Sequence, residues 1–294
     1  MTWYQEVMEA RAKRYRDAQS AFYTHPASAF IEPFRIADGL YYVGDKKVCL
    51  HLIETAEGLI LLDSGFYHTT HLLTESIRRL GFDPADVRWI LHTHEHFDHF
   101  GAADEFRTLY GTKSAISAVG AESIRENPRR ALMHWSNSEY QEIASFDYEL
   151  QDGEIFEFGG VKIRCILTPG HAPGVMSFFV EVTDNGEKHL AGLLGGAGTG
   201  AMSIEYMKDL DLPLDMPQRM LDSLDRLEKE PVTIHLGNHP SNNKVLQKRQ
   251  RQLEEGGNPF VDAASWKEFL AEMRENTQKI ILNNQEKLRQ HEGT

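Results

Sequence analysis

The chain has 294 residues, and its 31 basic and 44 acidic side chains leave a formal net charge of −13 at pH 7. This balance argues against non-specific binding to nucleic acids, which needs clustered Lys and Arg side chains against phosphates. Hydrophobic residues make up 41% and charged residues 26%, as in an ordinary globular protein, and no apolar run approaches the roughly 20 residues of a membrane-spanning helix.

The start of the chain bears on its localisation. Residues 1–19 carry charges throughout and lack the apolar core of a signal peptide, so we expect a cytoplasmic protein, or a periplasmic one if a signal peptide was trimmed. The two cysteines, Cys49 and Cys165, lie in apolar, strand-like runs. This placement favours two reduced thiols in the core over a disulfide.

The hydrophobic pattern predicts alternating strands and helices in what we expect to be a single domain over residues 1–294. An amphipathic helix is expected within residues 1–25, and a long helix over 262–291, where Asp262 can cap the first turn. Residues 120–147 lack a clear period and are expected to form a helix and a long loop. Strands are expected at 34–36, 40–43, 48–54, 59–63, 87–91, 113–117, 154–157, 161–167, 177–182, 190–194 and 232–236, and further helices at 69–80, 101–110 and 216–229.

The most informative stretch is Thr93-His94-Glu95-His96-Phe97-Asp98-His99, which directly follows the predicted buried strand at 87–91. Strand ends of this kind are where active-site loops gather in α/β architectures. A turn can bring His94 and His96 to one ion while Asp98 and His99 face a second, and these side chains suit zinc and similar ions. A surface histidine patch is the alternative, but such a patch would not normally lie between a buried strand and an amphipathic helix.

Two further histidines also follow predicted strands. His171 lies in TPGHAPG, a turn that two Pro-Gly pairs restrain, and His239 lies in LGNHPS after a short apolar run. Taken alone, each is an ordinary loop histidine. Their shared position at strand ends, together with the first motif, indicates that they complete a metal site.

These stretches resemble the signature of the metallo-β-lactamase superfamily, at Asp63-Ser64-Gly65, at His94 to His99, around His171 and at His239. The resemblance covers about residues 33–245. It implies an α+β fold, a four-layer αββα sandwich with two metal sites at one edge.

The resemblance also implies a ligand set. His94, His96 and His171 would hold the first metal, and Asp98, His99 and His239 the second. Two zinc ions are expected per chain, although His and Asp ligands also suit Mn, Fe and Co. Asp63 is not a ligand in the family, where it orients the ligand loops through hydrogen bonds.

One stretch departs from much of the superfamily. Many members place a metal-bridging Asp on the strand-end loop that follows, and the cysteine-containing β-lactamases place Cys there, whereas residues 193–200 (LLGGAGTG) contain neither. This is similar to the third, B3-type subclass of zinc β-lactamases, as are residues 33–44, 58–66 and 92–103. The departure has two interpretations: the arrangement of that subclass, or a weakened second site with one tightly bound and one labile metal.

The resemblance implies a binuclear zinc hydrolase in which an activated hydroxide opens a cyclic amide, as in β-lactam hydrolysis, with Asp98 as the catalytic residue that holds or accepts the proton. The alternatives are a lactonase or esterase of a small cytoplasmic metabolite, a member with only slight β-lactamase activity, and a metal-binding protein that no longer catalyses. We expect a small-molecule substrate and neither a nucleic-acid nor a membrane partner, with the oligomeric state left open.

Other polar residues near these motifs have weaker signals. His68, His134 and Ser241 are candidates to face the substrate, and for His68 a solvated loop position is the alternative. His92 is expected to pack beneath the site. Glu95, between two candidate ligands, is expected to point away from the metals.

Overall fold

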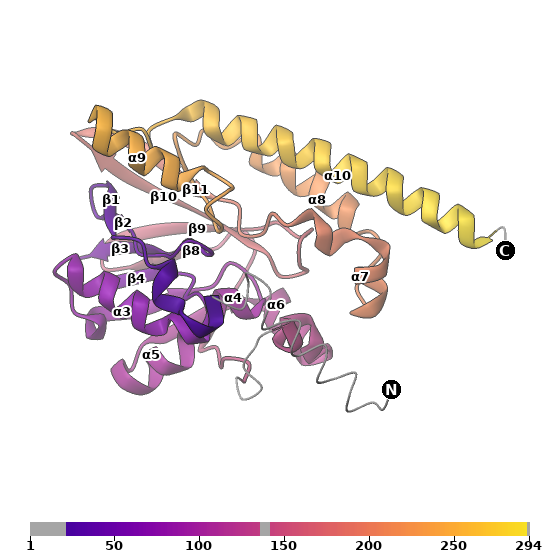
Figure 1. The fold of residues 1–294 in the computed structure, drawn as a ribbon, viewed down its shortest axis with the longest axis horizontal. Coiled ribbons are helices and arrows are strands. Elements are labelled where there is room, and N and C mark those ends of the chain that lie inside the picture. The colour runs from indigo at the N-terminus through magenta and orange to yellow at the C-terminus, as the bar shows by residue number, and fades with distance from the viewer. Residues whose placement is uncertain (1–21, 136–141, 293–294) are drawn as a thin grey trace.

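The computed structural model describes residues 22–135 and 142–292 (Figure 1). The helix predicted within residues 1–25 therefore lies almost entirely outside the described residues. Among the residues that the structure describes, no helix combines the length and the apolar character needed to cross a membrane.

The first half of the chain forms a seven-stranded sheet whose strands lie side by side in chain order. The strands are β1 (Phe34–Ala37), β2 (Leu40–Tyr42), β3 (His51–Thr55), β4 (Gly58–Leu62), β5 (Val87–Leu91), β6 (Lys113–Ser117) and β7 (Tyr148–Leu150). Strands β1 to β4 pair antiparallel, and β4 to β7 pair parallel. Because β4 and β5 run in the same direction, the loops that follow them meet at one edge of the sheet.

The second half of the chain forms a five-stranded sheet. Its strands are β8 (Ile155–Phe158), β9 (Val161–Leu167), β10 (Met176–Asp184), β11 (Glu187–Leu193) and β12 (Ile234–Leu236). They lie in the order β12-β11-β10-β9-β8, antiparallel except for the parallel pair β11 and β12.

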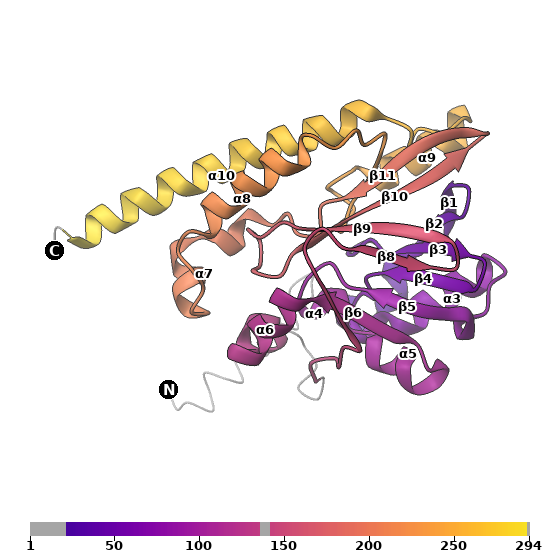
Figure 2. The same ribbon diagram turned by 180° about the vertical axis from the view of Figure 1, so that it is seen from behind.

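Helices cover the outer faces of both sheets (Figures 1 and 2). The helices labelled in these views are α3 (Thr70–Arg79), α4 (Phe97–Phe100), α5 (Ala103–Tyr110), α6 (Ala118–Glu126), α7 (Ile204–Asp209), α8 (Met216–Leu227), α9 (Val245–Glu255) and α10 (Ala263–Glu292). Short 3₁₀ helices occur at Pro26–Ala29, Tyr67–Thr69, Pro84–Asp86, Pro128–Ala131, Met133–Trp135 and Thr199–Met202. Helices α3 and α5 lie beyond the first sheet, and α8, α9 and α10 beyond the second.

The alternation of side chains along β4 shows how the layers pack. Ile60 and Leu62 belong to the apolar cluster between the two sheets, whereas Leu59 and Leu61 belong to the cluster beneath the helices. Successive strand residues point to opposite faces, so a strand covered on both sides is apolar throughout. The expected four-layer αββα sandwich is thereby confirmed. Cys49 and Cys165 are both free and buried, as expected.

Strand β3 begins at His51 rather than at residue 48 as predicted. The backbone NH of Cys49 donates instead to the carbonyl oxygen of Asn238, at 2.9 Å. Cys49 thus contacts the loop that carries His239. The hydrophobic pattern cannot show this, because it reports burial and not the backbone partner.

The long C-terminal helix α10 starts one residue after its predicted boundary and ends one residue later. The Asp262 carboxylate accepts hydrogen bonds from Ala264 N at 3.2 Å and Ser265 N at 3.3 Å, as a capping residue does. Farther along, the Asn284 side chain accepts from Ile204 N at 3.0 Å and donates to Met202 O at 2.9 Å. The distal part of α10 is thereby fixed to the segment that leads into α7.

Four elements were not predicted: β7, α4, α7 and α9. The first three have only three to six residues each, too few to show a period. Helix α9 has the sequence VLQKRQRQLEE, in which polar residues mask a narrow buried face formed by Val245 and Lys248.

A buried histidine of β12, four residues before His239, makes folding stability depend on pH. His235 packs against Trp266 and Phe269, and burial lowers its pKa to about 3. The unfolded chain binds this proton near pH 6.5. The free energy of unfolding should therefore be greatest above pH 6.5 and fall as the pH decreases toward 3, because the unfolded state takes up the proton first.

We expect the His235→Phe variant to remove one proton from this dependence, a slope of about 1.4 kcal/mol per pH unit between pH 6 and 4. Urea unfolding of both metal-free proteins at several pH values measures the slope, and the difference between them isolates His235. Equal slopes would show that His235 is not neutral in the folded protein.

Candidate metal centre

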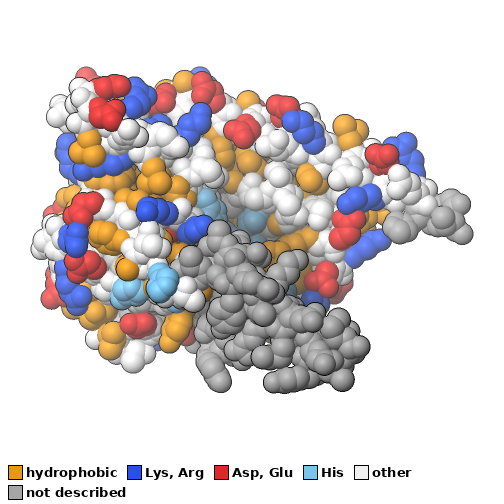
Figure 3. Space-filling view, viewed as in Figure 1, with side chains coloured by type: hydrophobic (Ala, Val, Ile, Leu, Met, Phe, Trp, Pro, Cys, Tyr) orange, Lys and Arg blue, Asp and Glu red, His pale blue; other side chains and the backbone are white. Residues whose placement is uncertain are grey.

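The candidate metal centre lies where strands of both sheets end. Residues 93–99, which extend into α4, follow β5 of the first sheet. His171 follows β9 and His239 follows β12, both in the second sheet. The space-filling view shows histidine side chains at the bottom of a hollow near the middle of one face (Figure 3). The predicted residues thus meet at one edge of the sandwich.

His94, His96 and His171 form the first cluster, in which one nitrogen of each ring lies within 4.8 Å of the other two. The Nε2 atoms of His94 and His171 each lie 3.1 Å from Nδ1 of His96. Ligand nitrogens around a tetrahedral zinc ion lie about 3.3 Å apart, given a zinc–nitrogen distance of about 2.05 Å. The spacing therefore suits three ligands of one ion.

Asp98, His99 and His239 form the second cluster, again with candidate ligand atoms within 4.8 Å of one another. Asp98 Oδ2 lies 3.5 Å from His99 Nε2 and 3.7 Å from His239 Nε2. These distances exceed those of hydrogen bonds between the same atoms. The ligand atoms of the three side chains therefore lie close together without forming hydrogen bonds to one another.

The hydrogen bonds behind the rings test whether the clusters fit a metal. Three histidines use Nδ1 to donate to a fixed acceptor, so Nε2 presents its lone pair to the cluster. Among the described residues, the buried Nε2 of His99 has no hydrogen-bond partner. Such orphaned lone pairs are what a divalent cation requires. The donor–acceptor pairs are His99 Nδ1 with Asp63 Oδ2 at 2.7 Å, His171 Nδ1 with Gly198 O at 2.8 Å, and His239 Nδ1 with Lys47 O at 2.7 Å.

Burial keeps the first cluster in its metal-binding form. Burial, together with the neighbouring histidines, holds the pKa values of His94 and His96 well below the usual value. Burial also lowers the pKa of His171 to about 4. All three rings are consequently neutral at pH 7, the state in which imidazole binds a metal.

The second cluster contains an ionised carboxylate. Burial raises the pKa of Asp98, but the facing His99 and His239 outweigh it and leave the pKa below the usual value. For His99 the directions are reversed. Burial lowers the pKa of its ring, but the carboxylates of Asp98 and Asp63 outweigh burial and raise this pKa above the usual value. The Asp98 carboxylate is therefore ionised at neutral pH.

Asp63 links the two clusters, in the position that the resemblance implies. Its Oδ1 accepts from Thr93 N at 2.7 Å, and its Oδ2 accepts from Thr93 Oγ1 at 2.8 Å and from His99 Nδ1. Thr93 Oγ1 lies 3.0 Å from Nδ1 of His94, which completes a path from Asp63 to the first cluster. The sequence analysis assigned no role to Thr93, although its position between the predicted strand and His94 could have indicated one.

Glu95 points away from both clusters, as expected. Its Oε1 accepts from Gly174 N at 3.2 Å, and Ser117 Oγ donates to Gly174 O at 2.6 Å. A Cβ at position 174 would lie 2.2 Å from the Cα of Gly120, so only glycine fits there. Glu95 thus joins the loop of His94 and His96 to the loop of His171.

The glycine-rich stretch after β11 lies directly against His171. A Cβ on Gly196 would lie 3.0 Å from the Cδ2 atom of that ring, and one on Gly198 would lie 2.9 Å from its Cε1 atom. The stretch packs beside the candidate centre by close backbone approach, as the sequence suggested. Side chains of the size of Asp or Cys would displace the imidazole in this arrangement.

The three candidate substrate-facing residues have different surroundings. His68 lies among the rings of Phe22, Tyr23 and Phe66, and burial lowers its pKa to about 4. His134 is exposed and contacts Trp135, and Ser241 is exposed. None of their described contacts reaches a ligand cluster, so their roles stay predictions. His92 packs beneath the site as expected, with its Nδ1 3.0 Å from His99 O.

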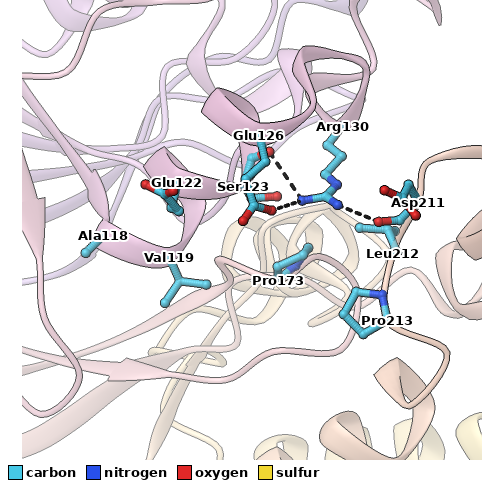
Figure 4. Close-up of a pocket in the computed structure, with 10 residues that line it drawn as sticks. All are labelled: Ala118, Val119, Glu122, Ser123, Glu126, Arg130, Pro173, Asp211, Leu212 and Pro213. Carbon is cyan, nitrogen blue, oxygen red and sulfur yellow. Dashed lines mark hydrogen bonds and ion pairs between the residues drawn. The ribbon is translucent and has the colours of Figure 1, made fainter.

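A separate pocket of about 550 Å³ lies behind the loop of His171 (Figure 4). Its Arg130 donates to the Glu126 carboxylate at 2.8 Å and to the carbonyl oxygens of Leu210 and Asp211. This guanidinium is fully engaged and fixes α6 to the segment after α7. Pro173, two residues from His171, forms another wall of the pocket.

Comparisons with known proteins agree with this geometry. Residues 50–184 match the family model described as the Metallo-beta-lactamase superfamily. The native FEZ-1 metallo-β-lactamase of Legionella gormanii superimposes with a TM-score of 0.78 and 25% identity, over 87% of this chain and 98% of that one. BJP-1, a subclass B3 metallo-β-lactamase of Bradyrhizobium japonicum, has the same fold, with a TM-score of 0.77 and 22% identity over 88% and 97% of the two chains.

The sequence relatives include proteins named as lactonases and glyoxalases. An N-acyl homoserine lactonase of Bacillus thuringiensis is 27% identical over 165 residues, 47% of this chain and 60% of that protein. The chain spans less than two thirds of the length of the curated relatives it matches. The matches therefore establish a metallo-β-lactamase domain over residues 50–184 and the fold, and leave the substrate to be argued from the site.

The Asp63→Asn variant should bind zinc about 10- to 100-fold more weakly at both clusters, because the amide cannot accept every hydrogen bond of the carboxylate. Thr93→Val is the matched variant, and it should weaken mainly the His94 cluster. Zinc titration against a competing chelator gives the two affinities. Unchanged affinity at both clusters in Asp63→Asn would contradict the linking role.

A methyl group at position 198 should act on one cluster alone. We expect Gly198→Ala to lower first-cluster zinc affinity by at least about tenfold, since the new Cβ displaces His171. Gly200→Ala is the control, because a Cβ there has no heavy atom within 4 Å. The same chelator titration reads the result, and equal affinities in the two variants would refute the packing argument.

Proposed function

We propose that this chain, whose residues 50–184 match the Metallo-beta-lactamase superfamily model, is a zinc-dependent hydrolase that opens a cyclic amide of the β-lactam type. Two clusters of three residues carry the proposal. Within each cluster, the candidate ligand atoms lie within 4.8 Å of one another. The family match and the structural neighbours support a metallo-hydrolase, and the proposal adds the binuclear site and the substrate.

Zinc bound at such clusters lowers the pKa of water to about 7 and polarises a carbonyl group. The residues of the chain would then have separate tasks. His94, His96 and His171 would hold one ion, and Asp98, His99 and His239 the other. The ionised Asp98 carboxylate would hold or accept the proton of the attacking water. The second cluster would face the leaving group.

The loop at residues 193–200 favours a cyclic amide over the alternatives. It contains no Asp, whereas the lactonase, esterase and glyoxalase branches that the sequence resembles usually have one there. The packing of Gly196 and Gly198 against His171 leaves no room for a carboxylate. We therefore rank β-lactam-type substrates first.

A lactonase or esterase acting on a small metabolite is the second candidate. The identity with an N-acyl homoserine lactonase favours it. In that case the chain would show only slight activity toward β-lactams. Both candidates use the same ligands, so the test must compare substrates and not only metal content.

We expect the zinc-loaded protein to hydrolyse a chromogenic cephalosporin, and Asp98→Asn to lose at least about 100-fold in kcat/KM because it cannot take the proton.

The His96→Ala variant tests the metal site itself and should lose tight metal binding. Turnover is followed by absorbance, and metal content by elemental analysis. Full metal content with no turnover would reject β-lactams, and lactones and esters would be assayed next.

A further inference from the structure

The pocket behind the loop of His171 is formed by three separate parts of the chain (Figure 4). Ala118 and Val119 begin α6, Pro173 belongs to the loop of His171, and residues 211–213 follow α7. Its volume of about 550 Å³ falls in the range of protein pockets that hold small organic molecules. None of the six candidate metal ligands is among the described residues that line it. The pocket is therefore a second cavity, separate from the ligand clusters.

The lining of this pocket is apolar and acidic. Half of its residues are Ala, Val, Leu or Pro, and the carboxylates of Glu122, Glu126 and Asp211 accompany a single guanidinium, that of Arg130. Arg130 is buried, and it donates to Glu126 and to the carbonyl oxygens of Leu210 and Asp211. Since the one positive group is bound to the protein itself, the charge of the lining favours a cationic ligand with an apolar body.

Two oxygen atoms of the lining are available to such a ligand. The exposed carboxylate of Asp211 forms no ion pair among the described residues, whereas Glu122 pairs with Arg125 at 2.9 Å and Glu126 with Arg130 at 2.8 Å. Ser123 is only 3% exposed, and its Oγ has no hydrogen-bond partner in the described part of the chain. An ammonium group carries three N–H donors and would supply the partner that both oxygens lack.

Hydrogen bonds join the walls of the pocket to the first ligand cluster. Pro173 is followed by Gly174, whose NH donates at 3.2 Å to Glu95, the residue between two candidate ligands. The carbonyl oxygen of Gly174 accepts from Ser117 Oγ at 2.6 Å. Ser117 is also the N-cap of α6, since its Oγ accepts from Gly120 N at 2.9 Å. The first turn of α6 and the loop of His171 are thus fastened to each other beside Glu95.

This junction has no spare space. A Cβ on Gly174 would lie 2.2 Å from the Cα atom of Gly120 and 2.7 Å from Oε2 of Glu95, and a Cβ on Gly120 would lie 3.3 Å from the same oxygen. Because close-packed backbones transmit displacements, α6 and the loop of His171 shift together. A molecule seated between α6 and Pro173 would therefore also fix the position of Glu95 and of the loops that carry the first cluster.

We propose that this pocket is a regulatory site for a small organic cation with an apolar body, and that its occupant raises the zinc affinity of the first cluster. Zinc would hold the loop of His171 through the imidazole, and the occupant would hold the same loop through Pro173. Two ligands that favour one position of a loop raise each other's affinity by the same factor. The inference rests on the metal site of the proposed function and not on its substrate.

The test measures binding of phenylbutylammonium, with phenylbutanol as its neutral comparator, by calorimetry on the metal-free and the zinc-loaded protein. We expect the ammonium to bind the zinc-loaded protein at least about fivefold more tightly than the metal-free protein. The alcohol should bind at least about threefold more weakly than the ammonium, because it lacks the charge. Equal affinity of the ammonium for the two forms of the protein overturns the proposal.

Variants locate the binding. Asp211→Asn should weaken binding of the ammonium at least about threefold, and Asn tolerates the left-handed backbone of this position, φ +52°. Asp209→Asn is the matched control and should bind like the wild type, since that carboxylate pairs with Arg129 at 2.9 Å and lies outside the lining. Val119→Phe should abolish binding of both probes, because the larger side chain fills the pocket from a helix position that is 41% exposed.

The outcomes separate the pocket from the metal site. Binding that survives Val119→Phe, or that falls equally in Asp211→Asn and Asp209→Asn, overturns the assignment of the pocket. Elemental analysis of the loaded sample reports its zinc content, and a sample without zinc would reject the proposed metal site and the coupling together. No step of the test measures turnover, so a failure of the proposed β-lactam reaction is seen separately.

Discussion

The hydrogen bonds of the Asp63 carboxylate orient side chains of both ligand clusters. The carboxylate is buried, and it accepts hydrogen bonds from the backbone and hydroxyl of Thr93 and from the ring of His99. The backbone of Asp63 has φ +59°, a left-handed conformation that costs a non-glycine residue of order 1–3 kcal/mol. Only a surrounding structure that fixes the residue can maintain such a conformation. The three hydrogen bonds supply that constraint. They also fix the orientation of Thr93 and His99.

Much of the fold and of the candidate site is legible in the sequence, for a physical reason. The strands at 87–91, 113–117 and 161–167 have the bounds that the sequence predicts, because each short run contains the buried apolar residues on which a strand prediction rests. The six candidate ligands could be identified because imidazole and carboxylate side chains stand at strand ends. The contacts of Lys47 and Gly198 could not, since both act through a backbone carbonyl oxygen, and any residue type carries one.

The ligand clusters determine the class of reaction, whereas the residues around them determine which substrate is accepted. The two clusters define a class of chemistry, and the relatives show that proteins named as β-lactamases and as lactonases share similarity with this chain. Discrimination between such substrates must come from groups outside the ligand set. The rings around His68 and the glycines that pack against His171 lie outside that set. The same metal chemistry can thus serve different substrates through changes that leave the ligands untouched.

The division of ligands between the two sheets has a consequence for stability. In the first cluster, His94 and His96 belong to the first sheet and His171 to the second. In the other cluster, Asp98 and His99 belong to the first sheet and His239 to the second. Any ion held there is a non-covalent cross-link between the halves of the sandwich, and its binding free energy adds to that of folding. A cell that runs short of metal would lose stable protein as well as activity.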